Sequence, residues 1–577
     1  MGYPPPHVIY IRQGTTLEQI PVPTKNVRPA FQGLFNVPAN DWAWTFGSWQ
    51  NEGSDWTLTA PVQQNMNFAA RWNSPYGPRA IPSELSPPEF PFETTCFINR
   101  AFYYMSENPG DYYLFLSEDH RVSANGFDLL PFSGGGAAAG TGTAFTVNAG
   151  AILRNSTVTL IGVNEMRTIT RGGLNGVLFA VTGNAEMILG ENITLSGNLN
   201  LPSNAGLLLL YGPAGTVASN ANLVMLEGSK ITRSHLTVAA ALLNAPVLVR
   251  GPNASFTMYG GAISGNTSAN VNIQNTGGVR VSHGATFTME GGEIHNNTLT
   301  GVIGVAGNAI ATAATGGVFV YGTSANPPTG TTFNMNGGRI HSNIVYGGSS
   351  AGGVAQVVGT TFNMNGGEIS NNTIRILDNE HSINSNTGGG VRTIGNLAQF
   401  NMNGGRISGN IVHGENSGGG VMIQGLVTVN INSGDISGNT AHGNLSGGGV
   451  GMNGNGHLNI RGGAIFANTA HGENSGGGLH VHISTLTGTP GHARIVSGTI
   501  YGSNAPAGRA NTAAETTSGA ALRATLGALH FGVWNNADEW VRNGSFTTTA
   551  PRAHVEGDTA GSGIYDNTIR AVNGVLQ

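Results

Sequence analysis

Apolar and polar positions alternate over short stretches in the middle of the chain. The segment that starts at Phe333 reads Phe-Asn-Met-Asn-Gly-Gly-Arg-Ile, so Phe333, Met335 and Ile340 are apolar while polar residues or glycines stand between them. Alternation with a period of two places the apolar side chains on one face of a short β-strand. A further strand is expected at each Gly-Gly-Gly-Val, as at 388–391 and 418–421. The pattern therefore predicts short strands separated by Gly and Asn turns.

This pattern repeats along the chain. Clear copies start at Phe256, Phe287, Phe333, Phe362 and Phe400, weaker copies at Val429, Leu458 and Ala493, and degenerate copies at Phe145, Ala185 and Leu223. The shortest interval is 29 residues, as between 333 and 362, and longer intervals contain inserted loops. Such short strands cannot bury an apolar face alone, whereas stacked coils can, and a propeller blade would need about 40 residues. We therefore expect an all-β fold, a right-handed parallel β-helix with one coil per period.

One column of the aligned repeat is almost purely asparagine. It contains Asn155, Asn266, Asn297, Asn343, Asn372, Asn410, Asn439 and Asn468. Amides stacked in register can hydrogen-bond to one another and to the turn backbone, as they do in cross-β stacks. A row of ligand-binding amides is the less favoured interpretation of so regular a position. We predict a structural ladder.

A second column alternates in charge, with Glu293, Arg339, Glu368, Arg406 and Asp435 on successive copies. Opposite charges on directly paired strand residues contribute about 0.2–1 kcal/mol each, and they disfavour a slip that brings like charges together. We interpret this column as control of the strand register.

Three histidines, His413, His442 and His471, recur at intervals of 29 residues. Three imidazoles spaced by about one strand separation of 4.8 Å would be able to bind a metal ion. Stacked turn residues of a repeat are the more common explanation, so no metal site is assigned, and the question stays open.

The two ends differ from the middle in aromatic content, because five of the seven tryptophans lie within the first 72 residues. Residues 73–95 are rich in Pro and Ser and read as a linker. Apolar spacing predicts a short helix over 97–108 and a strand over 112–116, which together would cap the end of a solenoid. The expected domains are a small β domain over 1–72, the linker over 73–95, the cap over 96–135, the β-helix over 136–535 and a closing segment over 536–577.

The first 72 residues resemble the internalin-type B-repeat of bacterial surface proteins. The resemblance rests on Pro21-Val22-Pro23-Thr24, the segment from Trp44 to Trp49, Trp56, Ala60-Pro61-Val62 and the segment from Asn65 to Trp72. It implies a small β-grasp-like module.

Charge and apolar runs exclude two kinds of partner. The chain has 25 Lys and Arg, a net charge of −5 and no basic run, whereas nucleic-acid binding needs a concentrated basic face. No stretch approaches the roughly 18 consecutive apolar residues of a transmembrane segment. Cys96 is the only cysteine, so no intrachain disulfide is expected.

From residue 97 to the end, coils of the form Phe-x-Met-x-Gly-Gly-x-Ile-Ser-x-Asn, followed by Gly-Gly-Gly-Val, are similar to those of bacterial secreted or cell-surface right-handed β-helix proteins. The resemblance implies an adhesin-like protein outside the cell. The opening residues lack the basic and apolar regions of a secretory signal peptide, so the expected location rests on the resemblance. The mode of surface attachment stays open.

Because Glu293, Glu368 and Asp435 belong to the charge column, we expect no catalytic residues and no cofactor. The one cluster of acidic residues outside it is Asp378 and Glu380 with His381, which we interpret as a solvated loop. The expected function is a non-enzymatic extracellular scaffold that is structural or adhesive and can assemble into a filament or surface layer. The alternative is a β-helix that binds or degrades polysaccharide, as lyases, hydrolases and phage tailspikes do.

Other copies of the chain, or surface glycans and proteins, are the expected partners. Projecting loops vary surface chemistry without disturbing a stacked core. Recognition is therefore expected on the tryptophan-rich head or on the insertions at 298–315, 321–331, 374–387 and 483–492.

Overall fold

The fold is that of a computed structural model of the 577-residue chain. The described residues are 8–10, 45–51, 54–55, 67–73, 97–116, 118–122, 129–133, 144–162, 165–172, 176–200, 203, 205–213, 219–236, 244–268, 275–302, 314–322, 330–375, 386–482, 492–513, 522–524, 529–531, 533–534, 540–541, 563–565, 569–572 and 575–576.

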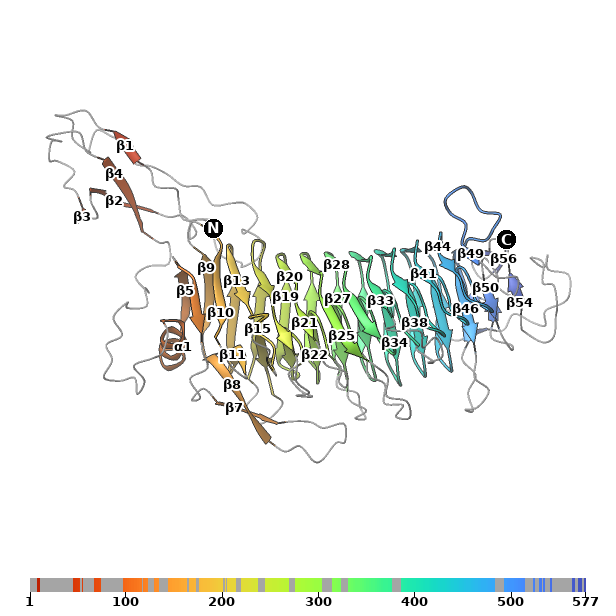
Figure 1. The fold of residues 1–577 in the computed structure, drawn as a ribbon, viewed down its shortest axis with the longest axis horizontal. Coiled ribbons are helices and arrows are strands. Elements are labelled where there is room, and N and C mark those ends of the chain that lie inside the picture. The colour runs from red at the N-terminus through yellow and green to blue at the C-terminus, as the bar shows by residue number, and fades with distance from the viewer. Residues whose placement is uncertain are drawn as a thin grey trace.

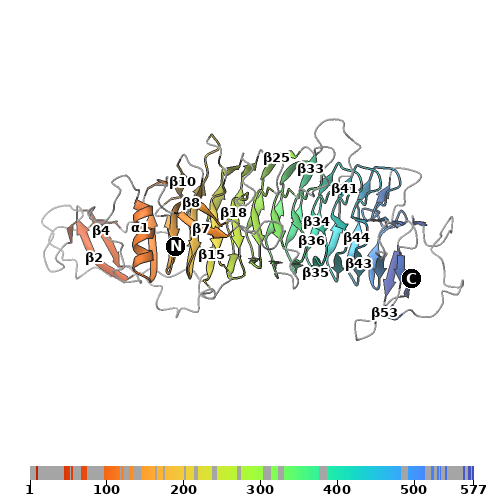
Figure 2. The ribbon, with the colours of Figure 1, turned by 90° about the horizontal axis from the view of Figure 1, so that it is seen from below.

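A right-handed parallel β-helix forms the body of the molecule, which confirms the predicted fold class (Figure 1). Each complete coil contributes one strand to each of four sheets, and the strands of successive coils stack along the long axis of the molecule (Figure 2). We number the sheets in the order in which a coil passes through them.

The first sheet is parallel throughout. Its strands are β5 (Asp111–Leu116), β9 (Thr157–Gly162), β12 (Ala185–Leu189), β15 (Ala221–Met225), β19 (Ala254–Met258), β23 (Thr286–Met289), β27 (Thr332–Met335), β31 (Thr361–Met364), β35 (Gln399–Met402), β39 (Thr428–Ile431), β43 (His457–Ile460), β47 (His492–Ile495) and β51 (Leu529–Phe531).

The second sheet follows a Gly-containing turn. Its strands are β6 (His120–Val122), β10 (Arg167–Arg171), β13 (Ile193–Ser196), β16 (Lys230–Thr232), β20 (Ala262–Ser264), β24 (Glu293–His295), β28 (Arg339–His341), β32 (Glu368–Ser370), β36 (Arg406–Ser408), β40 (Asp435–Ser437), β44 (Ala464–Phe466), β48 (Gly498–Ile500), β55 (Ile569–Val572) and β56 (Val575–Leu576).

The third sheet has short strands. They are β17 (His235–Leu236), β21 (Thr267–Ser268), β25 (Thr298–Val302), β29 (Ile344–Gly347), β33 (Thr373–Arg375), β37 (Ile411–Val412), β41 (Thr440–Ala441), β45 (Thr469–Ala470) and β49 (Thr512–Ala513).

The fourth sheet contains the strands that follow Gly-Gly-Gly. Its members are β7 (Leu129–Ser133), β8 (Ala144–Leu153), β11 (Val177–Thr182), β14 (Leu208–Tyr211), β18 (Val247–Arg250), β22 (Val279–Ser282), β26 (Val318–Tyr321), β30 (Val354–Gln356), β34 (Val391–Ile394), β38 (Val421–Gln424), β42 (Val450–Asn453), β46 (Leu479–His482), β50 (Leu522–Ala524) and β54 (Gly563–Tyr565).

Alternation within the strands produces one continuous apolar core inside the coil. The inward phenylalanines of the first sheet, Phe256, Phe287, Phe333, Phe362 and Phe400, are completely buried and pair in register. Their ring centroids are 4.7–4.9 Å apart, so the rings stack face to face. The spacing equals the separation of paired strands, because each ring belongs to one coil.

Glycine is required where a coil turns or approaches its neighbour. Gly367, the second glycine of a Gly-Gly turn, has a φ of +76°, which L side chains rarely adopt. At Gly352 a Cβ atom would collide with the carbonyl oxygen of Gly389 on the next coil. Both requirements recur with the repeat, which accounts for much of the high glycine content.

A helix covers one end of the stack, and antiparallel strands follow the last parallel strand in two of the four sheets at the other end. The predicted helix is confirmed as α1 (Phe97–Glu107), which buries Ile98, Phe102 and Met105 against the first coils. The ring of Phe102 lies 5.0 Å from that of Phe179 in the fourth sheet. At the other end β55 and β54 pair antiparallel with β48 and β50, which ends the parallel stacking of the second and fourth sheets.

The described part of the N-terminal segment consists of β1 (Val8–Tyr10), β2 (Thr45–Asn51), β3 (Ser54–Asp55) and β4 (Asn67–Asn73), in an antiparallel sheet of order β1-β4-β2-β3. The B-repeat resemblance stays a prediction. Residues 74–95 of the predicted linker lie outside the described residues. Near the C-terminus, β52 (Val533–Trp534) and β53 (Trp540–Val541) form a two-stranded ribbon. No described helix is long and apolar enough to span a membrane.

Two degenerate copies of the repeat were wrongly aligned. Phe145 lies in β8 of the fourth sheet, where β8 pairs with β7 and β11, so β9 is the first-sheet strand of that coil. In the next coil Met187, and not Ala185, pairs with Leu223 and therefore occupies the phenylalanine column. Both copies lack the Gly-Gly turn that marks the later coils. Their alignment rested on apolar spacing alone, which was not enough to set the register.

Candidate functional site

The buried asparagine ladder runs along the turn between the second and third sheets. Seven predicted members, Asn266, Asn297, Asn343, Asn372, Asn410, Asn439 and Asn468, are at most 1% exposed. Each Nδ2 donates to the Oδ1 of the asparagine on the following coil, at 2.9–3.0 Å.

Each amide inside this ladder makes four hydrogen bonds. In Asn372, Nδ2 donates to the Ile340 carbonyl and to Oδ1 of Asn410, each within 3.0 Å. Its Oδ1 accepts from the backbone N–H and the Nδ2 of Asn343, at 3.1 and 2.9 Å. A carboxamide has two N–H donors and one oxygen with two lone pairs, so its capacity is used completely. The ladder therefore stabilises the coil and offers nothing to a ligand.

The ladder differs from the predicted column at both ends. Asn155 is exposed, with a φ of +55°, and Ser156 is the buried residue of that turn, so including Asn155 was wrong. At the other end Asn511 accepts from Asn468 and donates to the Ile465 carbonyl. Sequence reasoning missed Asn511 because an insertion lengthens that coil, although the following Thr512 matches the Asn-Thr pair of other copies.

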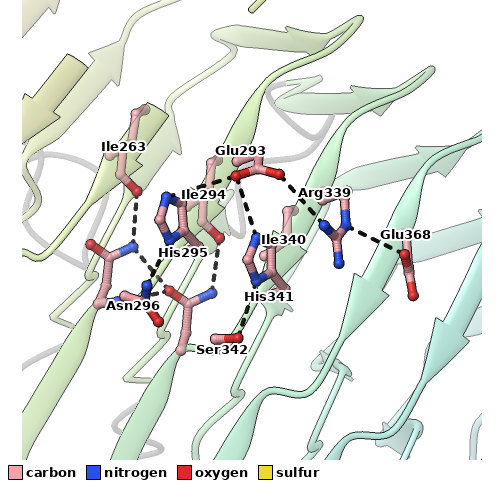
Figure 3. A network of polar contacts seen from close by, with 12 residues as sticks. Ile263, Glu293, Ile294, His295, Asn296, Arg339, Ile340, His341, Ser342 and Glu368 are labelled. Atoms are coloured by element: carbon pink, nitrogen blue, oxygen red, sulfur yellow. Dashed lines mark hydrogen bonds and ion pairs between the residues drawn. The ribbon is translucent and has the colours of Figure 1, made fainter. Parts of the chain in front are cut away.

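The charge column lies on the outer face of the second sheet. Strand pairing places Glu293, Arg339, Glu368, Arg406 and Asp435 directly beside one another on consecutive coils. Among the described members, ion pairs centre on Arg339, whose guanidinium nitrogens lie 3.6 Å from Glu293 and 3.4 Å from Glu368 (Figure 3). These side chains are between one-third and one-half exposed, so each pair contributes at most about 1 kcal/mol.

Two histidines that the sequence reading did not single out join this column. His295 and His341 stack with ring centroids 5.0 Å apart, and both Nε2 atoms lie within 3.9 Å of the Glu293 carboxylate (Figure 3). Burial lowers the pKa of His295, the neighbouring His341 lowers it further, and Glu293 opposes the shift. The signal was the Glu-Ile-His and Arg-Ile-His pair of adjacent copies.

The predicted histidine row forms a stack at the end of the third sheet. The rings of His413, His442 and His471 have centroids 4.5 and 4.7 Å apart and are nearly parallel, with interplanar angles of 3° and 9°. Burial lowers the pKa of His442, and the two flanking histidines lower it further. Parallel stacked rings direct their nitrogens side by side and not toward one point. Nowhere in the described parts of the chain do three His, Cys, Asp or Glu side chains group closely enough to hold a metal ion.

Two further amide rows lie on the outer face, and the sequence analysis missed both. The inner amide row, Asn334, Asn363, Asn401, Asn430 and Asn459, projects from the first sheet. The outer amide row, Asn336, Asn365, Asn403 and Asn432, follows the same strands at the turn. In both rows the Nδ2 of every asparagine after the first donates to the Oδ1 of the asparagine on the preceding coil, at 2.8–2.9 Å. The repeated Asn-x-Asn around the methionine was the available signal.

Buried arginines occupy the outer face of the fourth sheet. Arg280 donates to Oδ1 of Asn244, and its guanidinium lies 5.3 Å from the Phe319 ring centroid. Arg392 donates to the Ser349 carbonyl and to Oε1 of Gln424. Burial lowers the pKa of both guanidinium groups to about 10, so both stay protonated at neutral pH. They bind neighbouring segments to the sheet.

One carboxylate pair stands on the outer face of the first sheet. Asp111 and Glu186 flank Thr157 on three consecutive strands, so they are two strand spacings, or about 9–10 Å, apart. Burial raises the pKa of Glu186, and Asp111 raises it further. A raised carboxyl pKa suits a general acid, so this pair is the best-placed described group for the enzymatic alternative. The acidic group around Asp378 lies outside the described residues.

Most of each predicted recognition loop also lies outside the described residues, including 303–313, 323–329, 376–385 and 483–491. Comparison with known proteins adds no assignment, since no family model, no curated protein and no solved structure matches the chain.

Proposed function

We propose that the chain is a non-enzymatic extracellular scaffold at the bacterial cell surface, with a structural or adhesive role. The observation that carries the proposal is the use of polar side chains within ladders that run along the stack. The asparagine ladder and the ion pairs around Arg339 link one coil to the next. A repeat protein whose neighbouring coils are linked by such hydrogen bonds and ion pairs presents a long, preorganised surface.

The arrangement of the ends supports lateral assembly over end-to-end assembly. A β-helix end presents unpaired strand edges to which a second copy can add strands. In this chain β54 and β55 cover the fourth and second sheets with antiparallel strands. A filament that continues the parallel coils would therefore depend on the first and third sheets, whose strands stay parallel to their ends, and assembly into a layer would use the outer faces.

Two assays on the purified full chain test the proposal. Beads coated with the chain should bind the bacteria that produce it or the surfaces that these bacteria colonise. Beads coated with a heat-denatured sample should bind neither. Incubated with a panel of polysaccharides, it should release no new reducing ends and no unsaturated products. Product formation that disappears in the Glu186→Gln variant would contradict the proposal and support a polysaccharide-degrading β-helix.

A further inference from the structure

The outer face of the first sheet, from β27 to β39, carries three parallel rows of uncharged polar groups. The inner and outer amide rows supply two of them. The third, the hydroxyl row, contains Thr332, Thr361 and Thr428, with Gln399 in the same register. Neither Lys, Arg, Asp, Glu nor His occurs in these rows from Thr332 to Asn432, and on the next coil the rows continue as His457, Asn459 and Arg461. This neutral face differs in chemistry from the adjoining second sheet, which carries the charge column.

The exposed amides keep hydrogen-bonding capacity that the buried ladder has lost. Asn365 donates one N–H to Oδ1 of Asn336 and accepts one from Nδ2 of Asn403, each at 2.8 Å. A carboxamide offers two donors and two acceptor positions, so the bonds within the outer amide row use half of its hydrogen-bonding capacity. Asn336, Asn365 and Asn403 are all exposed. The hydrogen bonds within the outer amide row therefore hold each amide in place, while one donor and one acceptor of each amide face solvent.

An apolar ledge borders the same face. Leu397 is 69% exposed and Leu426 is 45% exposed, which makes them two of the few large apolar side chains at the described surface. The backbone N–H of Leu397 donates to the Leu426 carbonyl, so the two residues lie on adjacent coils. Each precedes its first-sheet strand by two residues, next to Gln399 and Thr428 of the hydroxyl row.

We infer that this neutral face binds an extended, uncharged polysaccharide that lies along the axis of the β-helix. A sugar ring combines hydroxyl groups, which donate and accept, with a face of C–H groups, and the outer amide row, the hydroxyl row and the ledge provide the matching partners. A polymer meets the same groups once per coil, so weak contacts add up without a further loss of translational freedom. The ladders also fix the amides beforehand, which lowers the entropic cost of binding.

The absence of ionisable groups from these rows decides which glycan fits. A uronate or sulfated polymer would lose hydration without gaining an ion pair at these three rows, whereas a neutral polymer exchanges hydrogen bonds with water for hydrogen bonds with amides. The inference rests on the proposed adhesive function and names its ligand class and surface.

The test is a sedimentation assay of the full chain with insoluble cellulose, chitin and β-1,3-glucan, and with cross-linked polygalacturonate as the charged comparison. The chain should bind at least one neutral polymer and bind it more tightly than polygalacturonate. Two double variants, Asn365→Ala with Asn403→Ala and Leu397→Ser with Leu426→Ser, should each weaken that binding by about tenfold, equivalent to about 1.4 kcal/mol. The matched control, Arg406→Ala with Ser408→Ala on the second sheet, should bind as the unaltered chain does.

Melting temperatures confirm that each variant is folded before its binding is scored. Wild-type binding to none of the three neutral polymers would overturn the inference, as would equal loss in the control variant. Partition into ice without binding to a glycan would overturn it too, because the rows would then be ordering water. If beads coated with the chain still retain cells while neutral polymers do not sediment it, the scaffold proposal survives and only the ligand assignment fails.

Discussion

Replacement of Asn372 by leucine tests the buried ladder most sharply, because this residue lies in its middle and makes four hydrogen bonds. Leucine fills a similar volume but cannot accept from Asn343. The backbone N–H of Asn343 and one N–H of its side chain then lose their acceptor inside the protein. Each buried, unsatisfied donor costs about 1–3 kcal/mol, so we expect a loss of about 2–6 kcal/mol.

The matched control is Asn365→Leu, on the same coil but in the exposed outer amide row. Water replaces the lost partners there, so its cost should stay below about 1 kcal/mol. Thermal unfolding followed by circular dichroism, with hydrogen exchange measured over residues 343–372, gives the comparison. Repeat proteins can unfold locally, and the exchange measurement shows whether the loss is confined to these coils. Equal destabilisation by the two variants would refute the assignment of the ladder as the principal polar support of the coil.

Three further predictions concern the core, the charge column and the histidine stack. Phe362→Ala removes one ring from the stacked column, and the resulting cavity should lower stability by about 3–5 kcal/mol in denaturant unfolding; a loss below about 1 kcal/mol would contradict the packing. Arg339→Ala should cost less than about 1 kcal/mol, and the difference from wild type should shrink in high salt; a salt-independent loss would count against the ion pairs. The pKa of His442 in the folded chain lies below its ordinary value of 6.5, so its contribution to stability is complete above that pH and is lost as the pH falls through the folded pKa. His442→Gln should therefore flatten the fall in melting temperature below about pH 6.5, and an unchanged profile would exclude a role for the stack.

The sequence predicts the repeat and its consequences well wherever the repeat is strict. Phe333, Met335 and Ile340 recur with fixed spacing. Short strands with this period can bury their apolar side chains only when the coils stack, and stacked coils form parallel sheets. The same regularity places Asn372 beside Asn343 and Asn410, because one residue of register error would turn every apolar side chain outward. The cap helix follows from the apolar spacing around Phe102.

Where the repeat decays, local pattern no longer determines the register. The segment around Phe145 alternates as a first-sheet strand would, but it lies in the fourth sheet. The alternation within a strand does not indicate which strand of the neighbouring coil it pairs with. Asn155 was assigned to the ladder by its spacing from Phe145. Because Phe145 lies in another sheet, that spacing places Asn155 at an exposed position. The two amide rows around Asn365 were missed for a different reason: a polar residue at an outward position of a strand need not pair with any other residue, so the sequence alone does not indicate a partner. Their pairing becomes visible only when the coils are stacked.

The location and accessibility of the chain on living cells test the central proposal most directly. Intact cells that produce the protein are treated with a membrane-impermeant biotinylation reagent, and labelling of the chain is compared with that of a cytoplasmic marker before and after lysis. A surface scaffold predicts that the chain is labelled on intact cells while the marker is not. Labelling of the chain only after lysis, in step with the marker, would contradict the account.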